Sequence, residues 1–364
     1  MHISIDTDTL QRLLSSLKDA AGKDAHVTLT AGADCTLSAH VRDQELGMRA
    51  EAGCAVTAAG ACYVQYGKLA SFVNALDRRD VTLRFDTNTL HMTCGTFKAS
   101  IDARPADEAP AWVSLTASAP ACDVPAAALY SLLHATTYAM SGDASRAILC
   151  GVCIDIPSAG LLRSTTTDGH RLARYSVAAP AGIERIFPAK VVLAARGAIA
   201  IEHLADKARA SMLRLSLEAG RIIATSDGDV AVSVAASFID GEYPNVDSVI
   251  PTDTACSVTV SPVELEACVM RVSRVLQREH GCSVQFVNDS IEVSCDDPMT
   301  GSCREAITAA PVGEGGFLAN HQFLLGALRQ VAGAESARVS FDGDVSPIYI
   351  ASGEHHAVVM PMHR

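Results

Sequence analysis

A short strand followed by an amphipathic helix recurs three times along the chain, and this repeat limits the folds open to it. The three copies are residues 3–17, 122–140 and 256–276. In each copy, Leu or Val side chains recur at the spacing that places them on one face of a helix. Pro125 and Pro262 fall where a first helical turn tolerates proline, and Ser261 is a favourable N-cap. The pattern therefore indicates that the chain consists of copies of one small unit.

A second pattern repeats in step with the first. A further apolar helix, a turn and two alternating strands follow in residues 67–93, 193–226 and 321–352. Proline-containing connectors at 101–110 and 239–251 also resemble each other, which argues against chance recurrence. We predict three similar α+β domains of about 120 residues each. Their expected boundaries are 1–118, 119–252 and 253–364.

Composition narrows the classes of protein further. The chain of 364 residues is 49% hydrophobic, which excludes a largely disordered protein. It has no apolar run near the roughly 18 residues of a membrane span, and its first residues do not resemble a secretion signal. A cytoplasmic protein without membrane contact is therefore expected. The net charge of −12 argues against DNA as a partner, although net charge does not describe how charge is distributed.

Twelve cysteines are scattered along the chain. In a long chain with no export signal, they are expected to be reduced and mostly buried as small hydrophobic residues. Cys150 and Cys153 form an isolated CxxC in a strand-like run, and no second ligand pair at metal-binding spacing accompanies them. The sequence predicts neither a metal site nor a cofactor.

The stretch TTTDGHRLARYSV, residues 165–177, is the most specific motif in the chain. Asp168 and His170 within it could be read as a catalytic acid–base pair. No nucleophile elbow, metal-ligand pair or phosphate loop accompanies them, and Asp-Gly is a common turn between strands. We therefore expect no catalytic residues and interpret the motif as a hairpin.

Together with three other segments, this motif resembles the bacterial DNA polymerase III beta subunits, the sliding clamps. The matching segments are residues 148–156, 167–173, 238–251 and 358–362. The resemblance implies three clamp domains, each with two helices against β-sheets, in an α+β fold. It also implies a head-to-tail homodimer that closes into a six-domain ring around double-stranded DNA. Such a ring is not an enzyme. Its implied partners are the polymerase III catalytic subunit, the clamp loader and other proteins with clamp-binding motifs.

The resemblance further implies a pocket for partner peptides between the second and third domains. Apolar side chains would form its groove, Met would adapt to varied partners, and His170 and Arg171 would supply polar contacts at the rim. The matching positions are Leu149, Thr167, Gly169, His170, Arg171, Leu172, Pro244, Val249, Val358, Val359, Met360, Pro361 and Met362.

Basic residues on exposed helix faces are candidates for a DNA channel. On a helix continuing to Leu276, three arginines would lie opposite the apolar face. Two more cations could share an exposed face in the first domain, and two would begin the second helix of the middle domain. Simple solvation of charged faces is the alternative. The candidates are Arg12, Lys23, Lys190, Arg196, Arg271, Arg274 and Arg278.

The leading prediction is thus a ring-shaped sliding clamp for DNA polymerase. The alternative is a clamp-like peptide-binding protein with reduced DNA loading. Retention on circular DNA distinguishes the two, because only a closed ring is held there by topology. If the clamp prediction holds, positive charge should line the channel and negative charge should cover the exterior.

Overall fold

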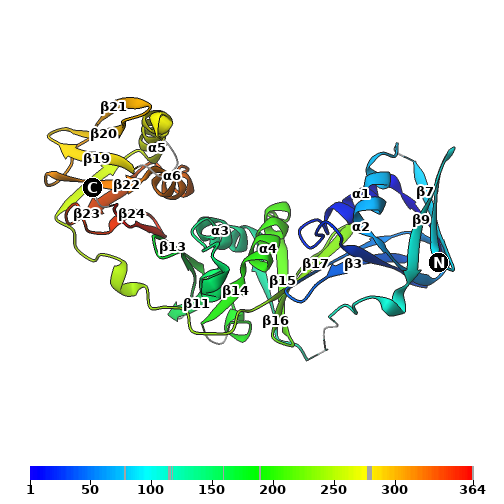
Figure 1. Cartoon of the computed structure of the whole chain (residues 1–364). Coiled ribbons are helices and arrows are strands. Elements are labelled where there is room, and N and C mark those ends of the chain that lie inside the picture. Colours follow the sequence, from blue (N-terminus) through cyan, green and yellow to red (C-terminus); the bar gives the residue numbers. More distant parts are fainter. Residues whose placement is uncertain are drawn as a thin grey trace. The chain divides into compact units, whose positions relative to one another are not determined.

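The computed structural model describes residues 1–77, 79–113, 116, 118–158, 160–187, 190–276 and 281–362. Its helices and strands follow one another in three cycles (Figure 1). Each cycle begins with a strand and a helix, continues through four or five strands to a second helix, and ends with three strands. The predicted repeat of helices and strands is confirmed, and so is the α+β class.

The first cycle contains β1 (His2–Asp6), α1 (Thr7–Ser15), β2 (His26–Ala31), β3 (Thr36–Arg42), β4 (Leu46–Gly53), β5 (Ala55–Ala58), β6 (Gly60–Gln65), α2 (Tyr66–Asn74), β7 (Asp80–Asp86), β8 (Thr89–Cys94) and β9 (Phe97–Pro105). The second contains β10 (Ala121–Pro125), α3 (Ala126–Thr137), β11 (Gly151–Ser158), β12 (Leu161–Thr167), β13 (Arg171–Ala178), β14 (Val191–Ala194), α4 (Ala195–Lys207), β15 (Met212–Glu218), β16 (Arg221–Ser226) and β17 (Val230–Ser237).

The third cycle contains β18 (Cys256–Val260), α5 (Pro262–Val272), β19 (Gly281–Val287), β20 (Ser290–Asp297), β21 (Gly301–Thr308), β22 (Gly315–Asn320), α6 (His321–Gln330), β23 (Ala337–Phe341), β24 (Ile348–Ser352) and β25 (His355–Val359). Short 3-10 helices lie between some of these elements. Those used below are η2 (Ala144–Leu149), η4 (Asp247–Val249) and η5 (Ser273–Val275).

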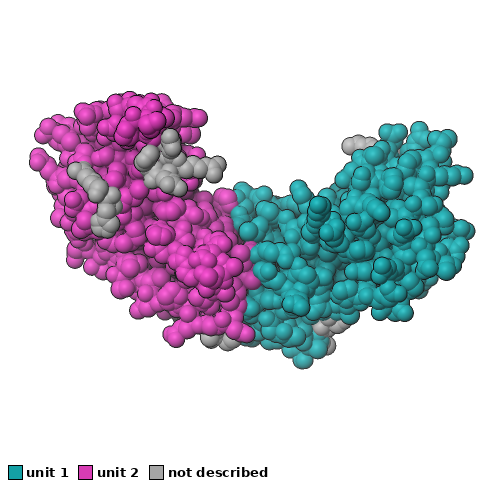
Figure 2. Space-filling model, viewed as in Figure 1, with its two compact units in different colours: residues 1–130, 180–188, 196–238 teal, residues 131–179, 189–195, 239–364 magenta. Residues whose placement is uncertain are grey.

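The chain forms two compact units, coloured separately in Figure 2. Unit 1 consists of residues 1–130, 180–188 and 196–238, and unit 2 of residues 131–179, 189–195 and 239–364. Both units take strands from more than one cycle. The domain boundaries expected near 118 and 252 stay a prediction.

Unit 1 is built on one sheet with the strand order β10-β15-β16-β17-β4-β3-β2-β6-β9-β8-β7-β1-β5. Strand β17 of the second cycle pairs antiparallel with β4 of the first, with Val234 opposite Met48. The Asp6 side chain caps α1 by accepting a hydrogen bond from the Thr9 amide, and Leu10 on this helix is buried. The sheet thus joins two cycles through backbone hydrogen bonds.

Unit 2 contains an eight-stranded sheet, β14-β11-β12-β13-β25-β24-β23-β18, and a four-stranded sheet, β21-β20-β19-β22. Here β13 of the second cycle pairs with β25 of the third, with Arg171 opposite Val359. Ser261 caps α5 by accepting a hydrogen bond from the Glu264 amide, as its sequence position predicts. Helices α5 and α6 contribute to one buried apolar cluster with the strands of the third cycle.

The third-cycle helix is shorter than its sequence predicts. Helix α5 ends at Val272 and a 3-10 turn follows, so Arg274 lies on η5 and Leu276 lies beyond it. The β-branched and serine residues of the segment Val272–Val275 are weak helix formers, which accounts for the early end. The expectation of a continuous arginine stripe on this helix is therefore wrong. Arg278 lies outside the described residues.

Three further local predictions need correction. Pro125 ends β10 rather than entering the helix, because an edge strand tolerates a missing amide donor. Lys190 precedes β14, since the residues after it pair with β11, so it does not begin α4. Lys23 lies in a turn beyond the end of α1. Each error arises because strand pairing or a turn interrupts a helix that local periodicity would extend.

All twelve cysteines are free, and eight of them are buried, as predicted. Cys153 lies in β11, but Cys150 follows η2 and precedes the strand, so the expected strand through both cysteines is only partly correct. Among the helices in the described part of the chain, none has the length and hydropathy needed to cross a membrane.

His355 makes the stability of unit 2 dependent on pH. Its Nε2 donates to the Ala135 carbonyl at 3.1 Å, and burial lowers the pKa of this histidine from 6.5 to about 4. Between these values the unfolded chain binds the proton more readily than the folded chain. The free energy of unfolding should therefore fall as pH drops from 6.5 toward 4.

We expect His355→Gln to flatten this dependence over pH 5 to 6.5, measured by thermal unfolding against pH. The half-exposed His91, which contacts the Ser100 hydroxyl, provides the control variant His91→Gln. Parallel pH profiles for the wild type and His355→Gln would contradict the prediction.

Candidate functional site

The turn between β12 and β13 is held by the Asp168 carboxylate. Its Oδ1 accepts hydrogen bonds from the amides of His170 and Arg171, each at 2.9 Å. Thr167 Oγ1 donates to the Arg171 carbonyl at 2.7 Å, and Gly169 has a φ of +90°, which suits glycine. The predicted hairpin is confirmed. Asp168 serves to build this turn, and this arrangement lends no support to an acid–base pair with His170.

Arg171 packs between aromatic side chains from two cycles. Its guanidinium carbon lies 4.7 Å from the ring centroid of Phe323 on α6 and 5.7 Å from that of Tyr138, just beyond α3. Its Nε donates to Asp168 Oδ2 at 3.0 Å. The His170 ring stacks on Phe323 with a centroid separation of 6.5 Å. Burial raises the pKa of the Tyr138 phenol. The Arg171 side chain therefore has a fixed position beside an exposed imidazole.

Gly326 allows α6 to approach this group closely. A Cβ at position 326 would lie 3.1 Å from Tyr138 Cδ2, which is tighter than ordinary van der Waals contact. The absence of a side chain on this face of α6 leaves room for the Tyr138 ring beside Arg171.

The C-terminal tail lies against the same hairpin. After β25, the Met360 amide donates to the His170 carbonyl at 2.8 Å, and the Met362 amide donates to the Leu318 carbonyl of β22 at 2.7 Å. Pro361 forms a bridge with Ala319. The tail thus runs from the hairpin turn to β22, and the Met360 side chain is 36% exposed. Met360 and His170 together present an apolar and a polar side chain to solvent.

The segment containing Leu149 also lies near this turn. Leu149 packs against a small buried cluster formed by Cys153, Val192 and Tyr243. Within η2, Arg146 approaches the turn, because its Nη1 lies 3.1 Å from where a Cβ on Gly169 would be. The short helix therefore adjoins the hairpin through a guanidinium group.

Pro244 and Val249 are exposed in the connector before β18. Asp247, which lies between them in the same connector, links it to strand β13. Asp247 Oδ1 accepts from Arg174 Nη2 at 2.6 Å, and this hydrogen bond lowers the pKa of Asp247. The structure therefore ties the connector to β13 through Asp247 and Arg174, and a role for Pro244 and Val249 stays a prediction.

Apart from the two connector positions, the predicted pocket positions divide into two groups. Gly169, His170 and Met360 are exposed, and Leu149, Arg171, Pro361 and Met362 are half-buried around them. The others at the hairpin and tail are buried within the strands and support the surface from below; they are Thr167, Leu172, Val358 and Val359. A role for any of these positions in peptide binding stays a prediction.

Three side chains at this site escaped prediction from the sequence. Phe323 lies in an apolar helical pattern that resembles core packing, and Tyr138 follows the periodic part of its helix. Arg146 lies in a 3-10 segment that has no regular pattern. Nothing local to these residues signals that they meet at Arg171 and Gly169.

Three of the candidate channel residues form ion pairs with carboxylates of other elements. Arg196 Nη1 pairs with Asp43 at 2.6 Å, and Arg12 lies 3.9 Å from an Asp229 oxygen. Arg271 Nε donates to Glu305 at 2.9 Å. These pairs partly neutralise the field that each arginine would present to a phosphate.

The other described candidates differ in their surroundings. Lys23 and Arg196 line one open hollow of unit 1 together with Arg42, but Asp19 and Asp43 line it as well. The Lys190 ammonium lies 6.0 Å from the Tyr243 ring centroid. Arg274 is exposed and forms no ion pair with any residue that the structure describes.

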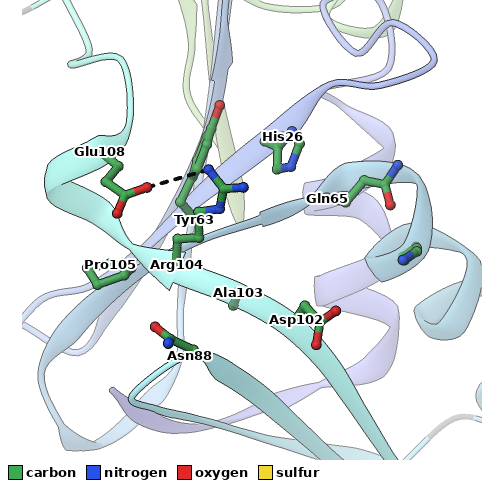
Figure 3. A pocket seen from close by; sticks show the side chains of 10 residues that line it. His26, Tyr63, Gln65, Asn88, Asp102, Ala103, Arg104, Pro105 and Glu108 are labelled. Carbon is green, nitrogen blue, oxygen red and sulfur yellow. Dashed lines mark ion pairs between the residues drawn. The ribbon is translucent and has the colours of Figure 1, made fainter.

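A separate polar hollow lies in unit 1 and contains none of the predicted site residues (Figure 3). His26 and Tyr63 stack on one wall with ring centroids 4.9 Å apart. Arg104 and Glu108 form an ion pair across 3.6 Å, drawn as a dashed line in Figure 3. Both partners of that pair are more than half exposed, so the hollow is an open and mixed-charge surface.

The three cycles of paired helices and sheets define a clamp-type fold. The structure matches, with a TM-score of 0.91 and 20% identity, the sliding clamp of Bartonella birtlesii, solved bound to griselimycin, over 100% of both chains. The Bacillus subtilis clamp structure gives a TM-score of 0.90 at 20% identity over 100% of this chain and 99% of that one. These likenesses identify the fold.

Family models identify the protein family. The DNA polymerase III beta subunit central domain matches residues 123–245, and its C-terminal domain matches residues 247–363. This chain belongs to the DNA polymerase III beta subunit family. It is 27% identical to the beta sliding clamp of Synechococcus elongatus, over 90% of this chain and 87% of that protein. The match to the Bacillus subtilis beta sliding clamp is 28% identical over 66% of this chain and 62% of that protein.

The packing of Arg171 predicts that lysine cannot replace it. Arg171→Lys loses the planar group between Tyr138 and Phe323 and the bond from Nε to Asp168. We expect the free energy of unfolding to fall by about 1–3 kcal/mol, measured by denaturant titration. Arg304→Lys on exposed β21 is the control, and an equal effect of both variants would show that the stacking contributes nothing.

Proposed function

We propose that this chain is a DNA sliding clamp that tethers DNA polymerase to duplex DNA. Membership of the DNA polymerase III beta subunit family carries this proposal, and the full-length likeness to clamp structures supports it. The comparisons give no support to the alternative of a clamp-like protein with reduced DNA loading. A clamp contributes topology rather than chemistry, so this function requires no catalytic residue. A cytoplasmic location fits the same role.

In this proposal, two copies associate head to tail and close a ring of six domains. Each copy would contribute the three segments 1–118, 119–252 and 253–364. A heterologous interface closes into a ring when its rotation completes a full turn. The duplex would then be retained without recognition of its sequence.

Weak attraction to phosphates is sufficient for such a ring. Exposed cations that form no ion pair with a described residue are the best candidates for this contact, and Lys23, Lys190 and Arg274 meet that condition. Arg12, Arg196 and Arg271 would have to exchange a carboxylate for a phosphate. The net charge of −12 would keep DNA away from the exterior of the ring.

We propose that the hairpin and the C-terminal tail receive peptides from the polymerase III catalytic subunit, the clamp loader and other clamp-binding proteins. Met360 offers an adaptable apolar contact, and Arg171 and the exposed His170 both contact the Phe323 ring. Phe323 extends the same surface through its stacking on His170. A hydrophobic centre with a polar rim is the usual composition of a protein-binding surface.

The function is tested by retention on circular DNA. Protein loaded by its clamp loader onto nicked circular DNA should stay bound through gel filtration and should be lost after the circle is cut once. Dissociation at the same rate from circular and linear DNA would contradict the ring. Arg274→Ala should shorten the retention time on circles, whereas Arg304→Ala, whose guanidinium pairs with Glu292, should leave it unchanged.

The peptide site is tested with two methionines. Met360→Ala should weaken binding of a clamp-binding peptide by about tenfold, because truncation of a central apolar contact costs more than 1 kcal/mol. Met299, which is 84% exposed, provides the control Met299→Ala, for which no change is expected. Binding is measured by fluorescence anisotropy of a labelled peptide. Equal affinities for both variants would show that Met360 does not contribute to peptide binding.

A further inference from the structure

Three cysteines form a row across adjacent strands of the four-stranded sheet in unit 2. Cys295 of β20 lies directly opposite Cys303 of β21. The register of β19 with β20 pairs Ser283 with Ser294, which puts Cys282 directly opposite Cys295. The thiols share one face of the sheet, because directly opposed residues point to the same side.

Helix α5 covers this face and adds a fourth thiol. Cys268 belongs to the same buried cluster as Cys282 and Cys295, and Cys303 packs against its edge. In the described part of the chain, no group of three or more potential ligands is arranged to hold a metal ion. The cluster is therefore a set of free thiols.

The spacing of the row permits a disulfide. Directly opposed residues of an antiparallel pair have Cα atoms about 4.5–5.5 Å apart, within the range of about 4.4–6.8 Å that disulfides span. The exposure of the thiols follows a gradient, since Cys303 is half-buried whereas Cys295 and Cys282 are almost completely buried. An oxidant from solvent would therefore reach Cys303 first, and Cys295 lies directly opposite it.

Hydrogen bonding prepares Cys295 to react as the second thiol. The Cys282 and Cys295 side chains form a thiol–thiol hydrogen bond, which lowers the pKa of Cys295 and raises that of Cys282. A stabilised thiolate is the form that attacks an oxidised sulfur.

Unit 1 contains a second pair of directly opposed cysteines, but the thiolate of Cys54 in that pair is not stabilised in this way. The register of β3 with β4 puts Cys35 opposite Cys54. Burial and the neighbouring Cys35 and Asp34 raise the pKa of Cys54, which opposes thiolate formation there. This pair is more accessible than the row in unit 2, so it serves as an internal comparison.

We propose that Cys303 and Cys295 are a peroxide-sensitive dithiol that closes to a disulfide. The Cys303 sulfur attacks hydrogen peroxide, forms a sulfenic acid and releases the first water. The Cys295 thiolate then attacks that sulfur, the S–S bond forms, and the departing hydroxide leaves as the second water after taking up a proton. Both thiols are oxidised by two electrons in total, and one peroxide is reduced to two waters.

The disulfide would form beside a candidate DNA-contacting arginine. Glu305, two residues beyond Cys303 on the same strand, accepts a hydrogen bond from Cys268 and pairs with Arg271. Oxidation would thus alter the packing beneath the Arg271–Glu305 pair. The dithiol proposal goes beyond the clamp function, and its chemistry can be tested without DNA.

The test is peroxide treatment of the full-length protein, followed by blocking of free thiols and mass spectrometry of peptides. The expected product has lost about 2 mass units, contains residues 295 and 303 in one cross-linked peptide, and reverts with dithiothreitol. Cys303→Ser should reduce this cross-link at least about tenfold, and Cys94→Ser, a buried cysteine outside the row, should not change it.

Three outcomes would overturn the proposal. The cross-link could map to Cys35 and Cys54 instead, or Cys303→Ser could retain the full loss of mass. Alternatively, Cys303 could oxidise to the sulfinic acid while Cys295 remains available to the blocking reagent. Because Cys303 is half-buried, its serine variant should fold, and circular dichroism before treatment verifies this.

Discussion

The backbone pairing of β13 with β25 is the interaction on which the candidate site depends. Hydrogen bonds between these strands join the second and third cycles, with Arg171 opposite Val359 and Leu172 opposite Val358. The pairing brings the hairpin turn, near the middle of the chain, against its C-terminal tail. Residues beyond the strand continue the contact, since the Met360 amide donates to the His170 carbonyl. Because side chains alternate along each strand, a shift of one residue would exchange buried and exposed positions on both strands.

The same principle organises unit 1, where β17 pairs with β4. Neither cycle involved completes its sheet alone. This explains why the two compact units combine segments from different cycles although the cycles repeat in sequence order. Hydrogen bonding across cycles leaves fewer free strand edges, and exposed edges are sites of unwanted association.

Charge in this protein is organised by pairing rather than by segregation along helices. Arg196 and Arg271, both chosen because they were expected on helices, have carboxylate partners from other elements. An exposed pair of this kind contributes little to stability, and a phosphate can compete for the arginine. The acidic composition therefore does not exclude contact with DNA, but it limits how strongly any single arginine would bind. The thiol row beneath Arg271 adds a chemical property that charge patterns do not reveal.

The sequence by itself determined the local elements and their threefold order, because apolar periodicity and capping act over a few residues. Ser261 at the start of α5 and the Asp168–Gly169 turn are examples in which the residue type dictates the local structure. The sequence also carried the resemblance to the clamp family. Only the tertiary structure decided that Arg271 meets Glu305 and that Tyr138 and Phe323 enclose Arg171. These contacts join residues far apart in the chain, and strand register and helix packing fix their positions. Local periodicity contains no information about either.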